Sequence, residues 1–228
     1  MTSTDLKTLS ISVIIPVLNE EQLIGPCLDR LFAHPEHNVL EIIVVDGGSS
    51  DATPEEISRR GLRPLSSDPG RGRQQHRGAE AASAAILLFL HCDTVLPNSF
   101  FEDICLTLAP KNVAAGAFRL HINGRRAGFR LLEAGVQLRS TVFSLPYGDQ
   151  ALFMHRETYF AAKGFPQQAI MEDVALVSRL KKLGKIALTP SRVTTSARRW
   201  QQHGLLKTTL INQLMLIGRA IGISPQQL

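Results

Sequence analysis

The amino-terminal part of the chain alternates between short apolar runs and segments whose apolar positions recur at helical spacing. Residues 11–17 form a β-branched run that predicts a buried strand. Residues 19–21 follow as a helix-start signal, and they precede apolar positions at helical spacing, namely Leu23, Ile24, Cys27, Leu28 and Leu31. The pattern predicts a first strand–helix unit.

The same alternation continues along the chain. Strands are predicted at residues 40–45, 62–65 and 86–90. Residues 50–56 supply a cap, a first-turn proline and first-turn acids for the helix after the second strand. Residues 71–85 predict an alanine-rich helix before the fourth strand. Four strand–helix alternations indicate an α/β fold with a mostly parallel, doubly wound sheet flanked by helices.

The pattern changes near residue 110. The elements predicted beyond it are strands at 113–122, 151–155 and 186–195 and helices at 129–142 and 172–183. We expect Gly184 to end the second of these helices and Pro190 to interrupt the last strand. No internal repeat, low-complexity tract or linker separates the two parts, so residues 1–228 are expected to form a single domain of two halves.

Composition narrows the class of protein. The 228 residues are 44% hydrophobic and 20% charged, which is ordinary for one soluble globular domain. The formal net charge of +5 suits an anionic ligand or an acidic membrane surface. Aromatic residues make up only 6% of the chain and do not alternate with basic residues as in a base-stacking groove. A nucleic acid is therefore not an expected partner.

The cysteines and the two ends of the chain bear on its location. Cys27, Cys92 and Cys105 have no metal-ligand spacing and cannot all pair, which favours a reducing, cytoplasmic setting. Residues 1–10 carry no signal-peptide pattern, and no stretch reaches the roughly 18 apolar residues of a membrane span. Residues 205–223 predict an amphipathic helix that covers the core, contacts a second copy in a homodimer, or attaches peripherally to the inner membrane face. Core or dimer packing is the default expectation.

Two of the predicted strands end in an aspartate inside a turn. Asp46 follows the strand at 40–45, and Asp93 follows the strand at 86–90. Because the ligand crevice of an open α/β sheet lies outside the carboxyl ends of its strands, both carboxylates are placed to meet one ligand. A nucleotide with a divalent cation is the natural candidate.

Four segments, in one order along the chain, carry a family resemblance. They are Val13–Glu21, Val44–Asp51, Asp93 with Pro97, and Glu172–Leu176 followed by Arg179, Leu180 and Gly184. With these motifs the chain resembles the family 2 glycosyltransferases of GT-A fold over most of its length. Finer strings at residues 70–74, 91–94 and 148–153 resemble a small soluble subgroup labelled arsenosugar-type glycosyltransferases.

The resemblance implies a GT-A, Rossmann-like domain that moves a sugar from a nucleoside diphosphate sugar to a hydroxyl acceptor with inversion. The donor-binding half would span about residues 10–110 and the acceptor and catalytic half about residues 111–228. The implied cofactor is a divalent metal ion, Mn²⁺ or Mg²⁺. The implied acceptor is a small-molecule or lipid-linked hydroxyl compound.

By the same resemblance, the catalytic residues open the helix predicted at 172–183. Asp173 is the general base that takes the proton from the acceptor hydroxyl, and Glu172 supports it or touches the acceptor. The alternative for both acids is a charge placed at a helix N-terminus. Asp149 and Gln150, after a turn, are expected to line the acceptor side.

The resemblance also implies a donor pocket at the strand ends. Pro16, Asn19 and Glu20 would line the nucleotide, although Glu20 also suits simple helix capping. Asp46 would accept a hydrogen bond from the base or the ribose. Asp93 is the expected metal carboxylate.

The remaining donor residues lie before and within the fourth strand. Arg71, Arg73 and Gln74 are assigned to the donor diphosphate by the subgroup resemblance, and a solvated basic face is the alternative for the arginines. His91 stands where the family has the first acid of an Asp-x-Asp motif. It contacts the donor, coordinates the metal, or is a satisfied strand histidine.

Residues 196–200 resemble the Gln-x-x-Arg-Trp element of processive relatives, except that serine replaces the glutamine, which weakens any expectation of processivity. By this likeness Arg199 would stabilise the leaving diphosphate, and Trp200 would stack on the acceptor sugar. His203 would complete the metal shell. A packed basic hinge is the alternative for this segment.

Two rival functions follow from the same residues. A sugar-phosphate nucleotidyltransferase has a similar sheet but needs a glycine-rich phosphate loop after the first strand. Residues 16–19 occupy that place here and contain no glycine, which counts against this function. A catalytically silent nucleotide-sugar-binding protein would keep the pocket, and His91 and Ser196 are the departures that favour it.

Overall fold

A computed structural model describes residues 10–124, 127–142, 146, 148–168 and 171–198. The helix predicted at 205–223 therefore lies outside the described residues, as do Arg199, Trp200 and His203.

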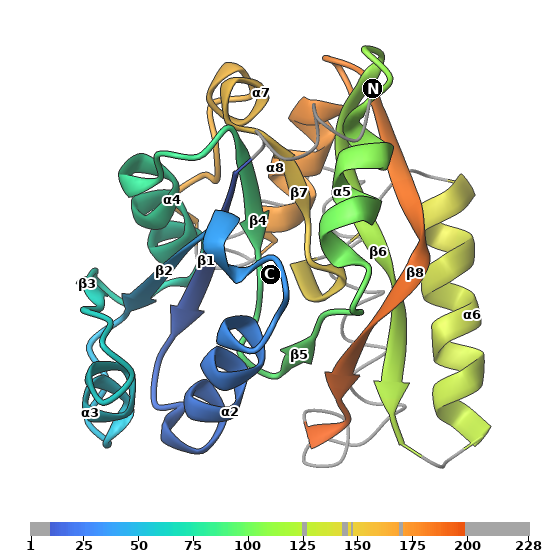
Figure 1. Cartoon of the computed structure of the whole chain (residues 1–228). Helices are drawn as coiled ribbons and strands as arrows, with labels where there is room; N and C mark the ends of the chain where they lie inside the picture. The colour runs from blue at the N-terminus through green and yellow to red at the C-terminus, as the bar shows by residue number, and fades with distance from the viewer. Residues whose placement is uncertain (1–9, 125–126, 143–145, 147, 169–170, 199–228) are drawn as a thin grey trace.

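The described strands form one sheet in the order β3-β2-β1-β4-β7-β6-β8-β5, with helices on both faces (Figure 1). The strands are β1 (Ile11–Val17), β2 (Leu40–Asp46), β3 (Leu65–Ser66), β4 (Ile86–Phe89), β5 (Thr94–Val95), β6 (Val113–Asn123), β7 (Phe153–His155) and β8 (Lys185–Ser196). Strands β1 to β4 pair in parallel, whereas β7 is antiparallel to both β4 and β6, and β5 is antiparallel to β8. The predicted mixed, mostly parallel sheet is confirmed.

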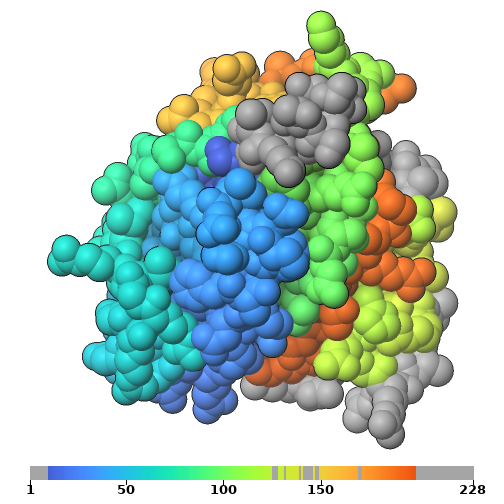
Figure 2. All heavy atoms as spheres, viewed as in Figure 1, coloured from blue at the N-terminus to red at the C-terminus, as the bar shows by residue number. Residues whose placement is uncertain are grey.

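The helices connect these strands. They are α2 (Glu21–Phe32), α3 (Thr53–Ser58), α4 (Arg71–Ala81), α5 (Phe100–Leu108), α6 (Ala127–Val142), α7 (Arg156–Ala161) and α8 (Glu172–Leu180), with 3₁₀ turns η1 (His37–Val39) and η2 (Gly148–Gln150). Figure 2 shows the face on which the surface of α2 and η1 adjoins that of α5.

Alternate side chains of the buried strands supply two apolar cores, one on each face of the sheet. On β1, Ile15 packs into the core that includes residues of α2 and α5. Its neighbour Ile14 packs into the opposite core, which includes residues of α4, α7 and α8. Burying one such side chain stabilises the folded state by about 1.5–3 kcal/mol, so both faces of the sheet hold helices firmly.

Strand direction decides where the loops gather. Because β7 runs antiparallel to both of its neighbours, β6 has the same direction as β4, and β8 is parallel to β6. The carboxyl ends of β1, β2, β4, β6 and β8 therefore share one edge, and Figure 1 shows the arrowheads of β6 and β8 pointing the same way. This edge carries the aspartates that follow β4 and end β2.

Pro190 interrupts the regular pairing of the last strand, as the sequence predicts, but it does not end the strand. Leu188 aligns with Ala117 and Arg192 aligns with Arg119, which leaves residues 189–191 as an irregular insertion in β8. An insertion without regular pairing accommodates a proline, which has no N–H to donate. The strand therefore continues to Ser196.

Other differences concern short or terminal segments. The third strand lies at 65–66 rather than at 62–65, and the helix predicted to reach residue 85 ends at Ala81. The strand β5 and the helices α5 and α7 are not among the elements predicted from the sequence.

Close packing of α4 on the sheet gives a stability prediction. A Cβ added at Gly78 of α4 would lie 2.4 Å from Ile14 Cγ2 and 3.1 Å from Val45 Cγ2, so Gly78→Ala should lower the free energy of unfolding by about 1–3 kcal/mol. Gly135 of α6 is the control, because nothing lies within 4 Å of its added Cβ, and Gly135→Ala should raise stability by about 0.5–1 kcal/mol. Urea unfolding measures both, and effects of equal sign would contradict the packing argument.

Candidate active site

The loops after β1 and β2 are locked together by hydrogen bonds. The Asn19 backbone N–H donates to Ser49 Oγ at 2.9 Å, and the Ser50 N–H donates to Asn19 Oδ1 at 2.8 Å. The Glu20 N–H donates to Thr53 Oγ1 at 2.8 Å. Asn19 has a positive φ of 54°, a conformation that asparagine tolerates well. These contacts fix the backbone on which two of the predicted donor residues lie.

Asp46 ends β2 and aligns with Val17 at the end of β1. Its two carboxylate oxygens accept the Ser49 N–H at 3.2 and 3.1 Å, and one of them also accepts the Ser49 hydroxyl. The carboxylate is half-buried and shapes its own turn. Pro16, one residue before Val17, is a buried residue of β1.

The side chain of Gln74 is buried and structural, which corrects its assignment to the donor. Its amide Nε2 donates to the carbonyl oxygens of Val17 at 2.7 Å and Val45 at 2.9 Å. Both amide hydrogens are therefore used to join the ends of β1 and β2. Gln74 supports the donor loops instead of offering its amide N–H groups to a ligand.

Gln150 is corrected in the same way. Its side chain is buried, its Oε1 accepts from Ser140 Oγ at 2.9 Å, and its Nε2 donates to the Phe118 carbonyl at 2.9 Å. It ties η2 to α6 and β6, so its amide does not line an acceptor site. Asp149, its neighbour in η2, is half-buried.

Asp93 lies in the turn after β4. The Thr94 N–H donates to the His91 carbonyl at 3.0 Å and closes this turn, and the Ser196 N–H donates to the Asp93 carbonyl at 3.2 Å. Burial raises the pKa of the Asp93 carboxyl, whereas the hydrogen bond from Thr94 and the charges of Arg198 and Arg71 oppose that shift. A carboxylate that is costly to ionise without a cation nearby suits a cation-binding position.

The N-termini of α4 and α8 touch beside this turn. Arg71 Nη1 lies 3.7 Å from Glu172 Oε1, and a Cβ added at Gly72 would lie 2.9 Å from the Cβ of Glu172. Glu172 is buried, and Asp173 follows it as a half-buried residue whose Oδ1 accepts the Val174 N–H at 2.7 Å. Arg71 thus lies between the turn of Asp93 and the helix that carries both predicted catalytic acids.

Arg198 is a site residue that the sequence reasoning missed. Its Nη2 donates to both carboxylate oxygens of Glu20, at 3.0 and 2.9 Å. The likeness to the Gln-x-x-Arg-Trp element pointed to Arg199, and the only signal for Arg198 was that it forms a basic pair with that residue. Charges therefore alternate along the edge in the order Glu20, Arg198, Asp93, Arg71 and Glu172.

Arg73 pairs with an acid outside this row of charges. Its Nη1 lies 3.1 Å from Asp68 Oδ2 in an exposed pair on the loop before α4. Exposed pairs of this kind contribute little stability. No contact of the described residues joins Arg73 to Asp93 or to Glu172.

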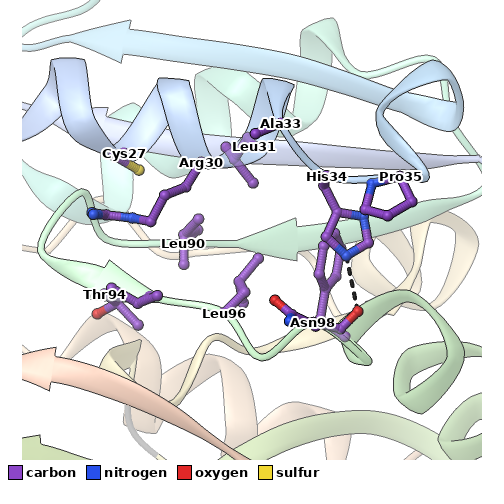
Figure 3. A pocket seen from close by; sticks show the side chains of 12 residues that line it. Cys27, Arg30, Leu31, Ala33, His34, Pro35, Leu90, Thr94, Leu96 and Asn98 are labelled. Atoms are coloured by element: carbon purple, nitrogen blue, oxygen red, sulfur yellow. Dashed lines mark hydrogen bonds between the residues drawn. The ribbon is translucent and has the colours of Figure 1, made fainter.

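A hollow of about 400 Å³ lies on the α2 side of the turn that carries Asp93. Figure 3 shows Arg30 and Leu31 of α2 on one wall and Thr94 and Leu96 on the other. Burial raises the pKa of Cys27, which also lines the hollow, to about 12, so this thiol stays protonated and unreactive at neutral pH. None of the predicted site residues that the structure describes lines this hollow.

No group of three or more His, Cys, Asp or Glu side chains in the part of the chain that the structure describes has metal-holding geometry. Among the helices described, none is long and apolar enough to cross a bilayer.

The sequence profile of glycosyl transferase family 2 matches residues 12–164, which is more than half of the chain. The chain belongs to glycosyl transferase family 2. This match confirms the family resemblance read from the motifs, whereas nothing confirms the arsenosugar-type subgroup.

Among curated relatives, glucosyl-3-phosphoglycerate synthase of Mycobacterium tuberculosis is 33% identical over 101 residues. The match covers 40% of this chain and only 31% of that protein, so the chain spans about a third of the relative's length.

Solved structures show the fold. The same mycobacterial synthase, in complex with Mn²⁺ and UDP-glucose, superposes with a TM-score of 0.62 at 22% identity, covering 86% of this chain and 74% of that one. The mannosyltransferase PcManGT of Pyrobaculum calidifontis, in complex with GDP-mannose and Mn²⁺, gives a TM-score of 0.66 at 21% identity, covering 82% and 57%. The predicted GT-A fold is confirmed.

The raised pKa of Asp93 gives a second prediction. A carboxyl whose pKa is higher in the folded than in the unfolded protein destabilises the fold when it is ionised. Asp93→Asn should therefore raise the free energy of unfolding at neutral pH, and the gain should vanish as the pH falls through the pKa of the folded Asp93 towards that of unfolded aspartic acid. Urea unfolding over a pH series measures this gain.

Asp103 provides the matched control. Its Oδ2 accepts hydrogen bonds from Ser99 Oγ at 2.7 Å and Ser191 Oγ at 2.6 Å, so Asp103→Asn should lower stability. A loss of stability in Asp93→Asn at neutral pH would show that Asp93 is a structural carboxylate of the same kind.

Proposed function

We propose that this chain transfers a sugar from a nucleoside diphosphate sugar to a hydroxyl acceptor with inversion of the anomeric centre. The observation that carries this proposal is the contact between the N-termini of α4 and α8, with Arg71 Nη1 at 3.7 Å from Glu172 Oε1. It brings the helix of the proposed base, Asp173, to the turn of the proposed metal carboxylate, Asp93.

The nucleoside would lie over the ends of β1 and β2. Asp46, half-buried at the end of β2, has acceptor oxygens for a base N–H or a ribose hydroxyl. Asn19 binds the loop after β2, and Gln74 joins the end of β1, the strand that contains Pro16, to the end of β2. The donors in the neighbouring structures, UDP-glucose and GDP-mannose, make uridine and guanosine nucleotides the first candidates.

The diphosphate would lie beside Asp93 together with a divalent ion. The half-buried carboxylate of Asp93 fits a hard cation that is bound jointly by protein carboxylate and phosphate oxygens. When bound, Mn²⁺ or Mg²⁺ would offset the charge of the departing diphosphate. Arg71 adds a second positive charge at the same turn.

Asp173 would perform the proton transfer. The acceptor hydroxyl gives its proton to the Asp173 carboxylate, the acceptor oxygen bonds to the anomeric carbon, and the bond from that carbon to the diphosphate oxygen breaks. Glu172, buried and paired with Arg71, holds the first turn of α8 in place and acts as a positioning residue. The acceptor would approach from the η2 side, where Asp149 is half-buried.

Substitution of Asp173 tests the assignment of the base. Asp173→Asn should reduce sugar transfer by about 10²–10⁴-fold, because the carboxamide cannot take the proton, while affinity for UDP or GDP stays the same. Release of nucleoside diphosphate from UDP-glucose and GDP-mannose measures turnover, and calorimetry measures affinity.

Glu157 of α7 is the control for Asp173, because it is an exposed first-turn acid of another helix. Glu157→Gln should leave turnover unchanged. Unchanged turnover in Asp173→Asn would remove this residue as the base. Nucleotide-sugar binding without turnover in the unaltered protein would favour the silent binding protein.

The role of Asp93 is tested by binding alone. Affinity for UDP or GDP should rise when Mg²⁺ or Mn²⁺ is added, and Asp93→Asn should lose this gain, which we expect to be roughly tenfold or more. Asp46→Asn should instead weaken uridine or guanosine binding equally with and without metal. A metal effect that survives in Asp93→Asn would place the ion elsewhere.

A further inference from the structure

Arg198 is placed at the edge of the site by the end of β8. Thr195 aligns with Thr94 across the β5–β8 pair, and the Ser196 N–H donates to the Asp93 carbonyl at 3.2 Å. The Arg198 N–H then donates to Ser196 Oγ at 3.1 Å. These contacts anchor the backbone of Arg198 next to the turn of Asp93.

The guanidinium of Arg198 bonds through one nitrogen to Glu20. Its Nη2 donates to the two oxygens of Glu20, at 3.0 and 2.9 Å. The side chains of Arg198 and Glu20 are 43% and 22% exposed. Solvent competes with an ion pair of this exposure, so the pair is easily exchanged for a stronger partner.

A diphosphate is such a partner. The diphosphate as a whole carries more negative charge than one carboxylate, and its oxygens accept parallel hydrogen bonds from two nitrogens of a guanidinium fork. Among the described residues, the hydrogen bonds of the Arg198 guanidinium are those from Nη2 to Glu20.

The surrounding charges favour the exchange. Glu20 and Asp93 place two carboxylates where a diphosphate would arrive, and Arg198 lies next to both of them. Without a positive charge at this point the carboxylates would repel the donor.

We propose that Arg198 is a diphosphate-binding residue of the donor site, and that Glu20 holds it in position until the donor displaces this carboxylate. The proposal rests on the proposed function. It assigns to Glu20 the role of a temporary partner for the guanidinium rather than that of a contact to the nucleoside.

The exchange predicts opposite effects for the two partners. Arg198→Gln should weaken binding of UDP or GDP, whichever the unaltered protein binds more tightly, by roughly tenfold. Glu20→Gln should strengthen it by a few-fold, because the competing carboxylate is gone. The double variant should bind the nucleotide more tightly than Arg198→Gln, because the unpaired Glu20 carboxylate no longer repels the diphosphate, and the corresponding nucleoside, which has no phosphate, should bind all variants equally.

Arg192 supplies the matched control. It lies six residues earlier in the chain, on β8, is exposed, and forms no ion pair with the described residues, so Arg192→Gln should leave nucleotide binding unchanged. Calorimetry of the full chain with UDP, GDP, uridine and guanosine gives the affinities. Thermal unfolding without ligand shows whether each variant folds, and Arg198→Lys, which keeps the charge without the fork, should bind at an intermediate strength.

Each contrary outcome is distinct. Equal weakening of diphosphate binding by Arg198→Gln and Glu20→Gln would make the pair a static structural contact and overturn the proposal. Weaker nucleoside binding in Glu20→Gln would make Glu20 a nucleoside contact, with the same consequence. If the unaltered protein binds neither UDP nor GDP with metal present, the proposed function itself fails. If the unaltered protein binds and Arg198→Gln binds equally well, only the role of Arg198 is overturned.

Discussion

Carboxylates gathered at one edge of a sheet repel one another unless positive charges lie between them, and this constraint governs the whole site. Strand direction brings the loops that carry Glu20, Asp93 and Glu172 to the same edge. Two guanidiniums, from α4 and from the end of β8, separate these acids in space. The resulting row of alternating charge keeps the edge open to a ligand that is itself an anion accompanied by a cation.

Local sequence predicted the parts of the fold that local physics determines. The apolar run at 11–17 and the helical spacing after residue 21 correspond to β1 and α2, and both aspartates do follow strands. Parallel strands then require these aspartates to share an edge, whatever the details of the loops. The GT-A fold was therefore readable from motif order and strand pattern together.

The partners of individual side chains at the site depend on tertiary contacts, which the sequence pattern does not show. Whether the Gln74 amide meets a ligand or two strand carbonyls depends on how closely α4 packs on β1, which no spacing along the chain reveals. Buried carbonyls at strand ends need donors, and a glutamine already nearby satisfies them before any ligand arrives. The placement of Arg198 likewise depends on the register of β8, which contains an insertion that periodicity does not show.

That insertion also limits how the chain can change in length. Between two aligned pairs β6 advances by two positions and β8 by four, an even surplus that leaves side-chain alternation in phase on either side of it. Loss of one residue from 189–191 would shift the phase by half a period and exchange inner and outer positions from Arg192 onward. Loss of two residues would remove the insertion and preserve the alternation. The strand can therefore become shorter by two residues while Arg198 still faces Glu20 and Asp93.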